Sequence, residues 1–194
     1  VQHDVAGLID LMGGKESFAM KLDSLFMLDT IAENTGFVSD VSGFIGQYAH
    51  GNEPSHHVVY LYNYVDQPWK TQELIPEIFE RFYKPKPDGL CGNDDCGQMS
   101  AWYIFSSMGF YPVDPISGEY VLGAPQMDKI SIQLTEDRAF VVEAENLSRK
   151  NKYVKSVELN GKPVRGLTIK HEDIMSGGHL VFTMTDEPMK RVLK

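Results

Sequence analysis

Apolar residues recur at helical spacing through the first part of the chain. Val5–Met12 carries an apolar side chain every three or four positions and runs into Gly13-Gly14, a pattern that predicts a short helix ending at glycine. The same periodicity predicts four further helices, over residues 17–28, 55–65, 72–83 and 97–108. Ser55 and Thr71 are expected to cap two of them, because a hydroxyl oxygen can accept a hydrogen bond from a free first-turn amide.

The pattern changes after Pro112 to alternation with a period of two. Alternation predicts half-buried strands, and it runs over Lys129–Leu134, Ala139–Ala144, Tyr153–Leu159, Leu167–Ile169 and His179–Met184. The dipeptide Asn160-Gly161 predicts a two-residue hairpin turn. We therefore expect an α+β class, with helical hairpins at residues 1–115 and an antiparallel β-sheet or small sandwich at residues 116–194.

Composition is that of an ordinary globular protein, with 42% hydrophobic and 23% charged residues among 194. The net charge of −9 argues against nucleic acid as a partner, which requires a basic face. No run approaches the roughly 20 apolar residues of a membrane helix, so a membrane is not expected either. A neutral substrate such as a sugar, together with a bound cation, suits this charge.

The chain opens Val1-Gln2-His3-Asp4, without a starting Met or the basic and apolar regions of a signal peptide. We therefore expect it to be a piece of a longer protein. Its two cysteines, Cys91 and Cys96, are too few for a zinc site unless histidines join them. Either a bridge or a pair of reduced thiols fits their spacing.

Side chains with site-like chemistry gather in two loops. Residues 50–57 hold three of the six histidines together with Glu53, and residues 88–95 hold three aspartates and Asn93. The adjacent carboxylates of Asp94 and Asp95 repel unless a cation or a raised pKa relieves them. Ca²⁺ prefers several oxygen ligands, and a cation beside a general base suits hydrolysis of a sugar bond.

Simpler interpretations compete with this one. Asn-Asp-Asp before a helix is often only a capping run, in which the acids favour the positive helix N-terminus. His56 and His57 are more often packed or solvated histidines than metal ligands, and Trp102 on an apolar helix face is usually a core residue. From the residue types alone, capping is the commoner role of Asp94 and Asp95.

Several long motifs resemble glycoside hydrolase family 92, the bacterial calcium-dependent exo-α-mannosidases. They are His3-Asp4-Val5-Ala6-Gly7-Leu8, Met12-Gly13-Gly14, Gly51-Asn52-Glu53-Pro54-Ser55-His56-His57, Tyr60-Leu61-Tyr62-Asn63-Tyr64, the run of residues 87–103, and Gly109-Phe110-Tyr111-Pro112. The resemblance implies that the helices are the last of an (α/α)₆ toroid that follows an N-terminal β-sandwich. It also implies a periplasmic or secreted protein.

The resemblance further implies an inverting, Ca²⁺-assisted hydrolysis of terminal α-linked mannose, which we expect to be of the α-1,2 type. Asp95 matches the general base; Asn93 stands where many relatives have a further aspartate, so Asp94 is expected to compensate. Glu53 and Asn52 match the motif that faces the calcium and the bound mannose. Glu53, His50 and Asn93 are the expected substrate-binding residues.

The family's general acid precedes the segment that matches Val1. The expected partners are thus a mannose-containing glycan and the missing N-terminal part of the same protein. We expect this chain alone to be inactive and to associate with itself through uncovered apolar helix faces. Linkage specificity is expected to depend on the missing sandwich and on a loop near Asn34–Gly43.

Two other functions remain open: a non-catalytic carbohydrate-binding module that kept the fold, and a retaining glycosidase of another helical-toroid family. Loss of the Glu53 or Asp95 carboxylate would favour the first, and both are present. The oxygen-rich pair of loops and the length of the motif match count against the second. Fold alone does not decide between them.

Overall fold

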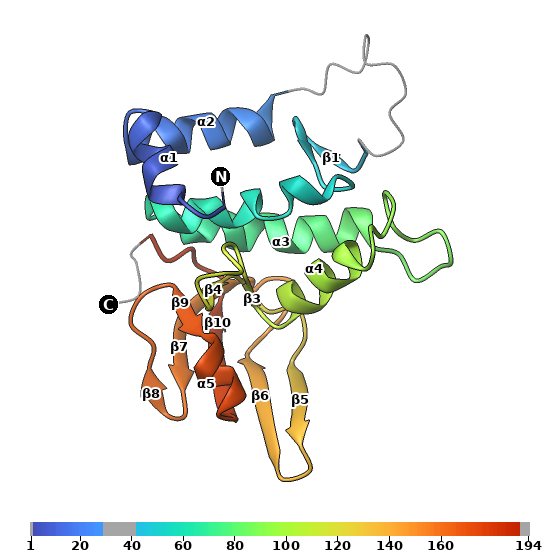
Figure 1. Cartoon of the computed structure of the whole chain (residues 1–194), viewed down its shortest axis with the longest axis vertical. Coiled ribbons are helices and arrows are strands. Elements are labelled where there is room, and N and C mark those ends of the chain that lie inside the picture. Colours follow the sequence, from blue (N-terminus) through green and yellow to red (C-terminus); the bar gives the residue numbers. More distant parts are fainter. Residues whose placement is uncertain (1, 29–41, 191–194) are drawn as a thin grey trace.

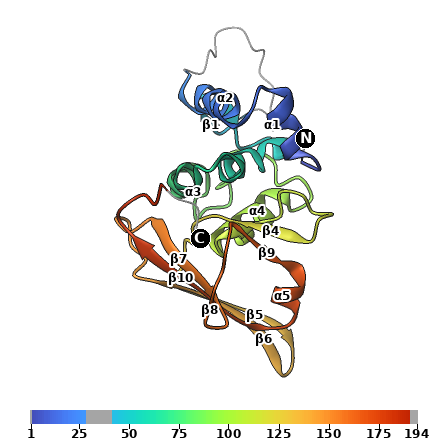
Figure 2. The same ribbon diagram turned by 90° about the vertical axis from the view of Figure 1, so that its left-hand side faces the viewer.

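The computed structural model describes residues 2–28 and 42–190. Its helical elements are α1 (Val5–Leu11), α2 (Lys15–Met27), the 3₁₀ helices η1 (Glu53–Ser55) and η2 (Val58–Val65), α3 (Pro68–Phe82), α4 (Gln98–Ser107) and α5 (His171–Met175). Its strands are β1 (Phe44–Ile45), β2 (Tyr48–Ala49), β3 (Phe110–Tyr111), β4 (Glu119–Leu122), β5 (Lys129–Thr135), β6 (Arg138–Glu145), β7 (Tyr153–Leu159), β8 (Lys162–Pro163), β9 (Thr168–Lys170) and β10 (Gly178–Thr185). Helices α1–α4 lie at one end of the molecule and strands β5–β10 at the other (Figures 1 and 2).

A first cluster of buried apolar side chains holds the helical half together. Phe18, Leu22 and Phe26 line the inner face of α2, and their spacing of four residues produces the predicted stripe. They share this cluster with buried residues of η2 and α3. Among the helices in the described ranges, none combines the length and the apolar character needed to cross a membrane.

Two details of the helical prediction are wrong. The segment 55–65 forms 3₁₀ turns rather than an α-helix, and its residues 59–63 are all buried. Thr71 does not cap a helix, because α3 already begins at Pro68, where proline is well tolerated. The Thr71 hydroxyl instead donates to the Val59 carbonyl at 2.8 Å.

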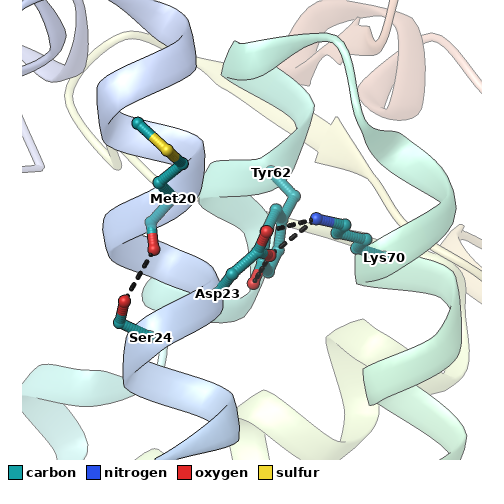
Figure 3. Close-up of polar contacts among 5 residues, drawn as sticks. All are labelled: Met20, Asp23, Ser24, Tyr62 and Lys70. Atoms are coloured by element: carbon teal, nitrogen blue, oxygen red, sulfur yellow. Dashed lines mark hydrogen bonds and ion pairs between the residues drawn. The ribbon is translucent and has the colours of Figure 1, made fainter.

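A half-buried carboxylate links α2 to the next two helical elements. Lys70 Nζ of α3 lies 2.6 and 2.8 Å from the two Asp23 oxygens, and Tyr62 Oη of η2 donates to Asp23 Oδ1 at 3.0 Å (Figure 3). The figure also shows the Ser24 hydroxyl bonded within α2 to the Met20 carbonyl. Asp23 therefore fixes how α2 lies on η2 and α3.

The main sheet has the strand order β5-β6-β10-β7-β8 and is mixed. β10 pairs parallel to β6 and antiparallel to β7, so the expectation of a purely antiparallel sheet is wrong for the β6–β10 pair. β6 and β7 run in opposite directions, and a strand placed between two such neighbours must be parallel to one of them. A second buried cluster, which includes Phe140, Leu180 and Phe182, lies against this sheet.

The predicted hairpin turn is confirmed. Asn160 and Gly161 both have positive φ, at 52° and 72°, as a type I′ turn requires, and Leu159 pairs with Lys162. A three-stranded sheet of order β3-β4-β9 lies between the halves. Because β3 and β4 pair across the predicted boundary at 115/116, the two-domain division remains a prediction.

Candidate functional site

The two loops singled out in the sequence lie against each other, backbone to backbone. A methyl group on Gly92 would lie 2.8 Å from the carbonyl oxygen and 2.9 Å from the Cα of Gly51. Ser42 reinforces this contact, since its carbonyl accepts from Gly51 N at 3.0 Å and its hydroxyl donates to the Cys91 carbonyl. Asn52 and Glu53 follow Gly51 directly, and residues 93–95 follow Gly92. The fold therefore brings the two loops into contact at these glycines.

The second loop enters α4 through three consecutive residues with left-handed backbone. Asp95, Cys96 and Gly97 have φ of 49°, 56° and 93°. The first two are not glycine, and such a conformation costs free energy that the surrounding structure must offset. Asp95 is also solvent-exposed. Strained, exposed residues of this kind are concentrated at functional sites.

Asp94 has the capping role that the residue types suggested. Its Oδ1 accepts from Ser100 N at 2.9 Å, and its Oδ2 accepts from Ser100 Oγ at 3.0 Å. Its carbonyl also accepts from Met99 N at 3.1 Å. Both carboxylate oxygens therefore hold the first turn of α4.

His50 lies behind the first loop rather than on its surface. The side chain is fully buried, with Nδ1 2.8 Å from Tyr48 Oη and Nε2 2.8 Å from Tyr83 Oη. Burial lowers the pKa of His50 to about 2, so the ring is neutral. With both nitrogens hydrogen-bonded, the ring has no accessible polar atom for a sugar hydroxyl, contrary to the expected direct contact.

His56 is also a packed residue. Its Nε2 lies 2.9 Å from the His50 carbonyl, and its Nδ1 accepts from Gln98 Nε2 at 3.2 Å. Burial lowers its pKa. The fully buried Trp102 donates from Nε1 to the His56 carbonyl at 3.1 Å, which confirms Trp102 as a core residue. These bonds attach α4 to the first loop.

The chain provides oxygen donors for a cation but not a complete set. Across residues 2–28 and 42–190, no three His, Cys, Asp or Glu side chains form a group that could hold a metal ion. Glu53 is exposed and Asn52 half-buried, and both carry the oxygen ligands that Ca²⁺ prefers. Since Ca²⁺ takes six to eight oxygens, these residues fit only part of its coordination shell.

The two cysteines are free thiols, Cys91 half-buried and Cys96 exposed. Burial raises the pKa of the Cys91 thiol to about 11, so it is protonated and unreactive near neutral pH. Of the two arrangements that the spacing allowed, the reduced pair is the one observed.

Residues 1–186 match the sequence model of the glycosyl hydrolase family 92 catalytic domain. The chain belongs to glycosyl hydrolase family 92. It is similar over its whole length to the family 92 alpha-mannosidase BT3965 from Bacteroides thetaiotaomicron, solved in complex with mannoimidazole, at 44% identity and a TM-score of 0.92. It is also similar over its whole length to the family 92 inverting mannosidase BT2199 from the same organism, at 38% identity and a TM-score of 0.84.

A relative described as an uncharacterized secreted glycosidase, from Arthroderma benhamiae, is 29% identical over 190 residues, which are 96% of this chain and 22% of the relative. The chain likewise spans 25% of the BT3965 structure and 27% of the BT2199 structure. It therefore represents about a quarter of the length of the family 92 proteins it matches.

Several residues that shape the contact between the two loops carried no signal of their own in the sequence. Ser42 and Tyr83 lie outside both motifs, and only folding brings their side chains against the loops. Gln98 stood inside a motif but was assigned no role. Of the expected linkage loop, residues 34–41 lie outside the described ranges.

The pockets in the described ranges include one that borders the second loop and one that is lined by neither loop. One of about 570 Å³ is lined by Tyr83, Leu90, Ser100 and Tyr103, among others. Another of about 770 Å³ lies between α3 and the β6–β7 connection, far from Asp95 in the sequence.

Proposed function

We propose that the intact protein is an exo-α-mannosidase and that this chain supplies the base side of its active site. The contact between Gly51 and Gly92 carries the proposal, because Asn52 and Glu53 directly follow the first of these glycines and the strained, exposed Asp95 lies three residues after the second. Family membership supports it, as do two similar structures whose names identify them as mannosidases. In the intact protein α1–α4 would be the last helices of an (α/α)₆ toroid.

In this proposal Asp95 is the general base of an inverting hydrolysis. A water molecule on the far side of the sugar ring would give its proton to the Asp95 carboxylate as it attacks the anomeric carbon. The acid that protonates the leaving oxygen would come from the part of the protein outside this chain. Asp94 would hold the turn through Ser100, and Asn93, exposed beside Asp95, would contact the substrate.

Asn52 and Glu53 would hold a Ca²⁺ together with oxygen ligands from outside this chain. When bound, the ion would polarise sugar hydroxyls and favour the distorted ring of the transition state. Glu53 would also contact the mannose. The proposed substrate is terminal mannose in a glycan, of the α-1,2 linkage type.

The stereochemistry of the first product tests this function in the full-length protein. Proton NMR during hydrolysis of an aryl α-mannoside should show β-mannose first, with the α-anomer growing in later by mutarotation. The matching α-glucoside is the control and should be hydrolysed far more slowly. Initial release of α-mannose would instead indicate a retaining enzyme. Glycan binding without turnover would indicate a binding module.

Calorimetric titration of Ca²⁺ tests the cation separately. Glu53→Ala should weaken Ca²⁺ binding by at least about tenfold, since a carboxylate ligand is lost. Glu136→Ala is the matched control, because Glu136 is exposed in the β5–β6 turn, and it should bind as the wild type does. Equal affinities in all three proteins would remove Glu53 from the cation site.

A further inference from the structure

We propose that Tyr83 is a positioning residue of the proposed glycosidase site, where its hydroxyl sets the distance between the two loops. This inference rests on the proposed function. Tyr83 immediately follows α3. Its hydroxyl contacts His50 of the first loop and Met99 in the first turn of α4.

The hydrogen bonds through Tyr83 have one consistent direction. The Tyr83 hydroxyl donates its single proton to the Met99 carbonyl at 3.0 Å, because a carbonyl can only accept. Its oxygen must therefore accept from His50 Nε2–H at 2.8 Å. In a neutral ring Nδ1 then accepts, and the Tyr48 hydroxyl donates to it at 2.8 Å. Every member of this buried chain is satisfied.

Tyr83 also anchors the second loop at its beginning. It forms an isolated antiparallel bridge with Leu90, and the next residue, Lys84, donates from its amide to the Gly89 carbonyl at 2.9 Å. Its ring stacks on Trp102 with an interplanar angle of 7°. Tyr83 therefore contacts the first loop and α4 through its side chain and the start of the second loop through its backbone.

Removal of the hydroxyl alone isolates this role from ring packing. In Tyr83→Phe the rings still stack, but His50 Nε2–H loses its acceptor and the Met99 carbonyl loses its donor. Movement of the proposed base by about 1 Å can cost up to about a hundredfold in rate. Because the base acts on water only as the transition state forms, the loss should be in kcat more than in KM.

Tyr60→Phe is the matched control. Tyr60 belongs to the same core, in which it is fully buried while Tyr83 is half-buried. The Tyr60 hydroxyl bonds to Ser106 Oγ at 2.8 Å, away from both loops. In the full-length enzyme we expect kcat on an aryl α-mannoside to fall about tenfold to a hundredfold in Tyr83→Phe. In Tyr60→Phe kcat should fall less than about threefold, while the melting temperature should fall by a similar amount in both variants. Equal kcat values in the two variants would overturn the proposal.

Hydrogen exchange gives a readout that does not depend on activity. Amides of residues 91–98 should exchange faster in Tyr83→Phe than in Tyr60→Phe, and unchanged exchange would also overturn the proposal. If Tyr83→Phe does not fold, Tyr48→Phe replaces it, because it breaks the same series of hydrogen bonds at the other end. Tyr48→Phe must then show the same loss of kcat and the same faster exchange of amides 91–98. An inactive wild type would refute the proposed function, while exchange would still decide the role of Tyr83.

Discussion

Gly92 is the residue on which the close approach of the two loops depends most directly. Any side chain there would collide with backbone atoms of Gly51, which cannot rotate away as the end of a flexible side chain could. The φ of Gly92 is not among the positive values, so alanine fits its backbone conformation. Substitution therefore probes the contact between the loops rather than backbone strain.

Gly92→Ala should lower kcat of the full-length enzyme by about tenfold or more, since it pushes the base loop away from Asn52 and Glu53. Gly118→Ala is the control: it adds strain at φ of 70° but meets no atom within 4 Å, and kcat should stay close to that of the wild type. Steady-state kinetics beside melting curves measure both. Similar kcat losses in the two variants would mean that the loop contact is not needed.

Sequence reasoning singled out two loops that the fold brings into contact, but it could not assign each side chain within them. Motif matching and residue type placed Asp95, Glu53 and His50 together as site residues. His50 is a buried support because Tyr48 and Tyr83 fill both of its hydrogen-bonding positions, and those tyrosines reach it only in the fold. Asp94 and Asp95 are equivalent as residue types, and the structure distinguishes them by the bonds from Ser100 to Asp94 and by the left-handed backbone of Asp95.

At the scale of elements, the periodicity found the helices and the main strands but not their pairing. Alternation along residues 178–185 shows that a strand is half-buried, not which neighbours it has. The parallel β6–β10 pair follows from the insertion of β10 between β6 and β7, a long-range event with no local signal. In the helical half, the contacts of Asp23 decide how α2, η2 and α3 pack (Figure 3).

Asp23→Ala should destabilise the protein by about 1–3 kcal/mol, because it leaves the Lys70 ammonium and the Tyr62 hydroxyl without their acceptor. The Lys70 and Asp23 side chains are only 27% and 35% exposed. Lys15→Met is the control, since Lys15 pairs with Asp66 while both are 56% exposed, and its effect should stay below about 1 kcal/mol. Denaturant unfolding of the full-length protein compares them. Equal changes in the free energy of unfolding of the two variants would show that Asp23 contributes no more than an exposed surface charge.

At the scale of the molecule, α1 and α2 leave apolar side chains uncovered. Leu11 is 88% exposed and Met27 80% exposed, and Met20 on α2 is exposed as well. In the proposed toroid, neighbouring helices outside this chain would cover this surface. The same part of the protein outside this chain would carry the general acid. Self-association and inactivity of the isolated chain would then have one origin.

The isolated 194-residue chain should therefore associate with itself and show no turnover of an aryl α-mannoside. Light scattering during gel filtration should find oligomers that the double substitution Leu11→Ser, Met27→Ser reduces. Ile116→Ser is the control, because Ile116 is 90% exposed but lies between β3 and β4. A monomeric wild-type chain, or turnover comparable to that of the intact enzyme, would contradict this account.

The kinetics of Asp95→Asn in the full-length enzyme test the central claim most directly. Asparagine tolerates the left-handed backbone that Asp95 adopts and caps a helix as well as aspartate does, but it cannot accept the proton of water. The account predicts that kcat falls by roughly 10²–10⁴ with an unchanged melting curve. Asp94→Asn, which keeps an acceptor for Ser100, should lose less than about tenfold. Near-normal kcat in Asp95→Asn would contradict the assignment of Asp95 as the base.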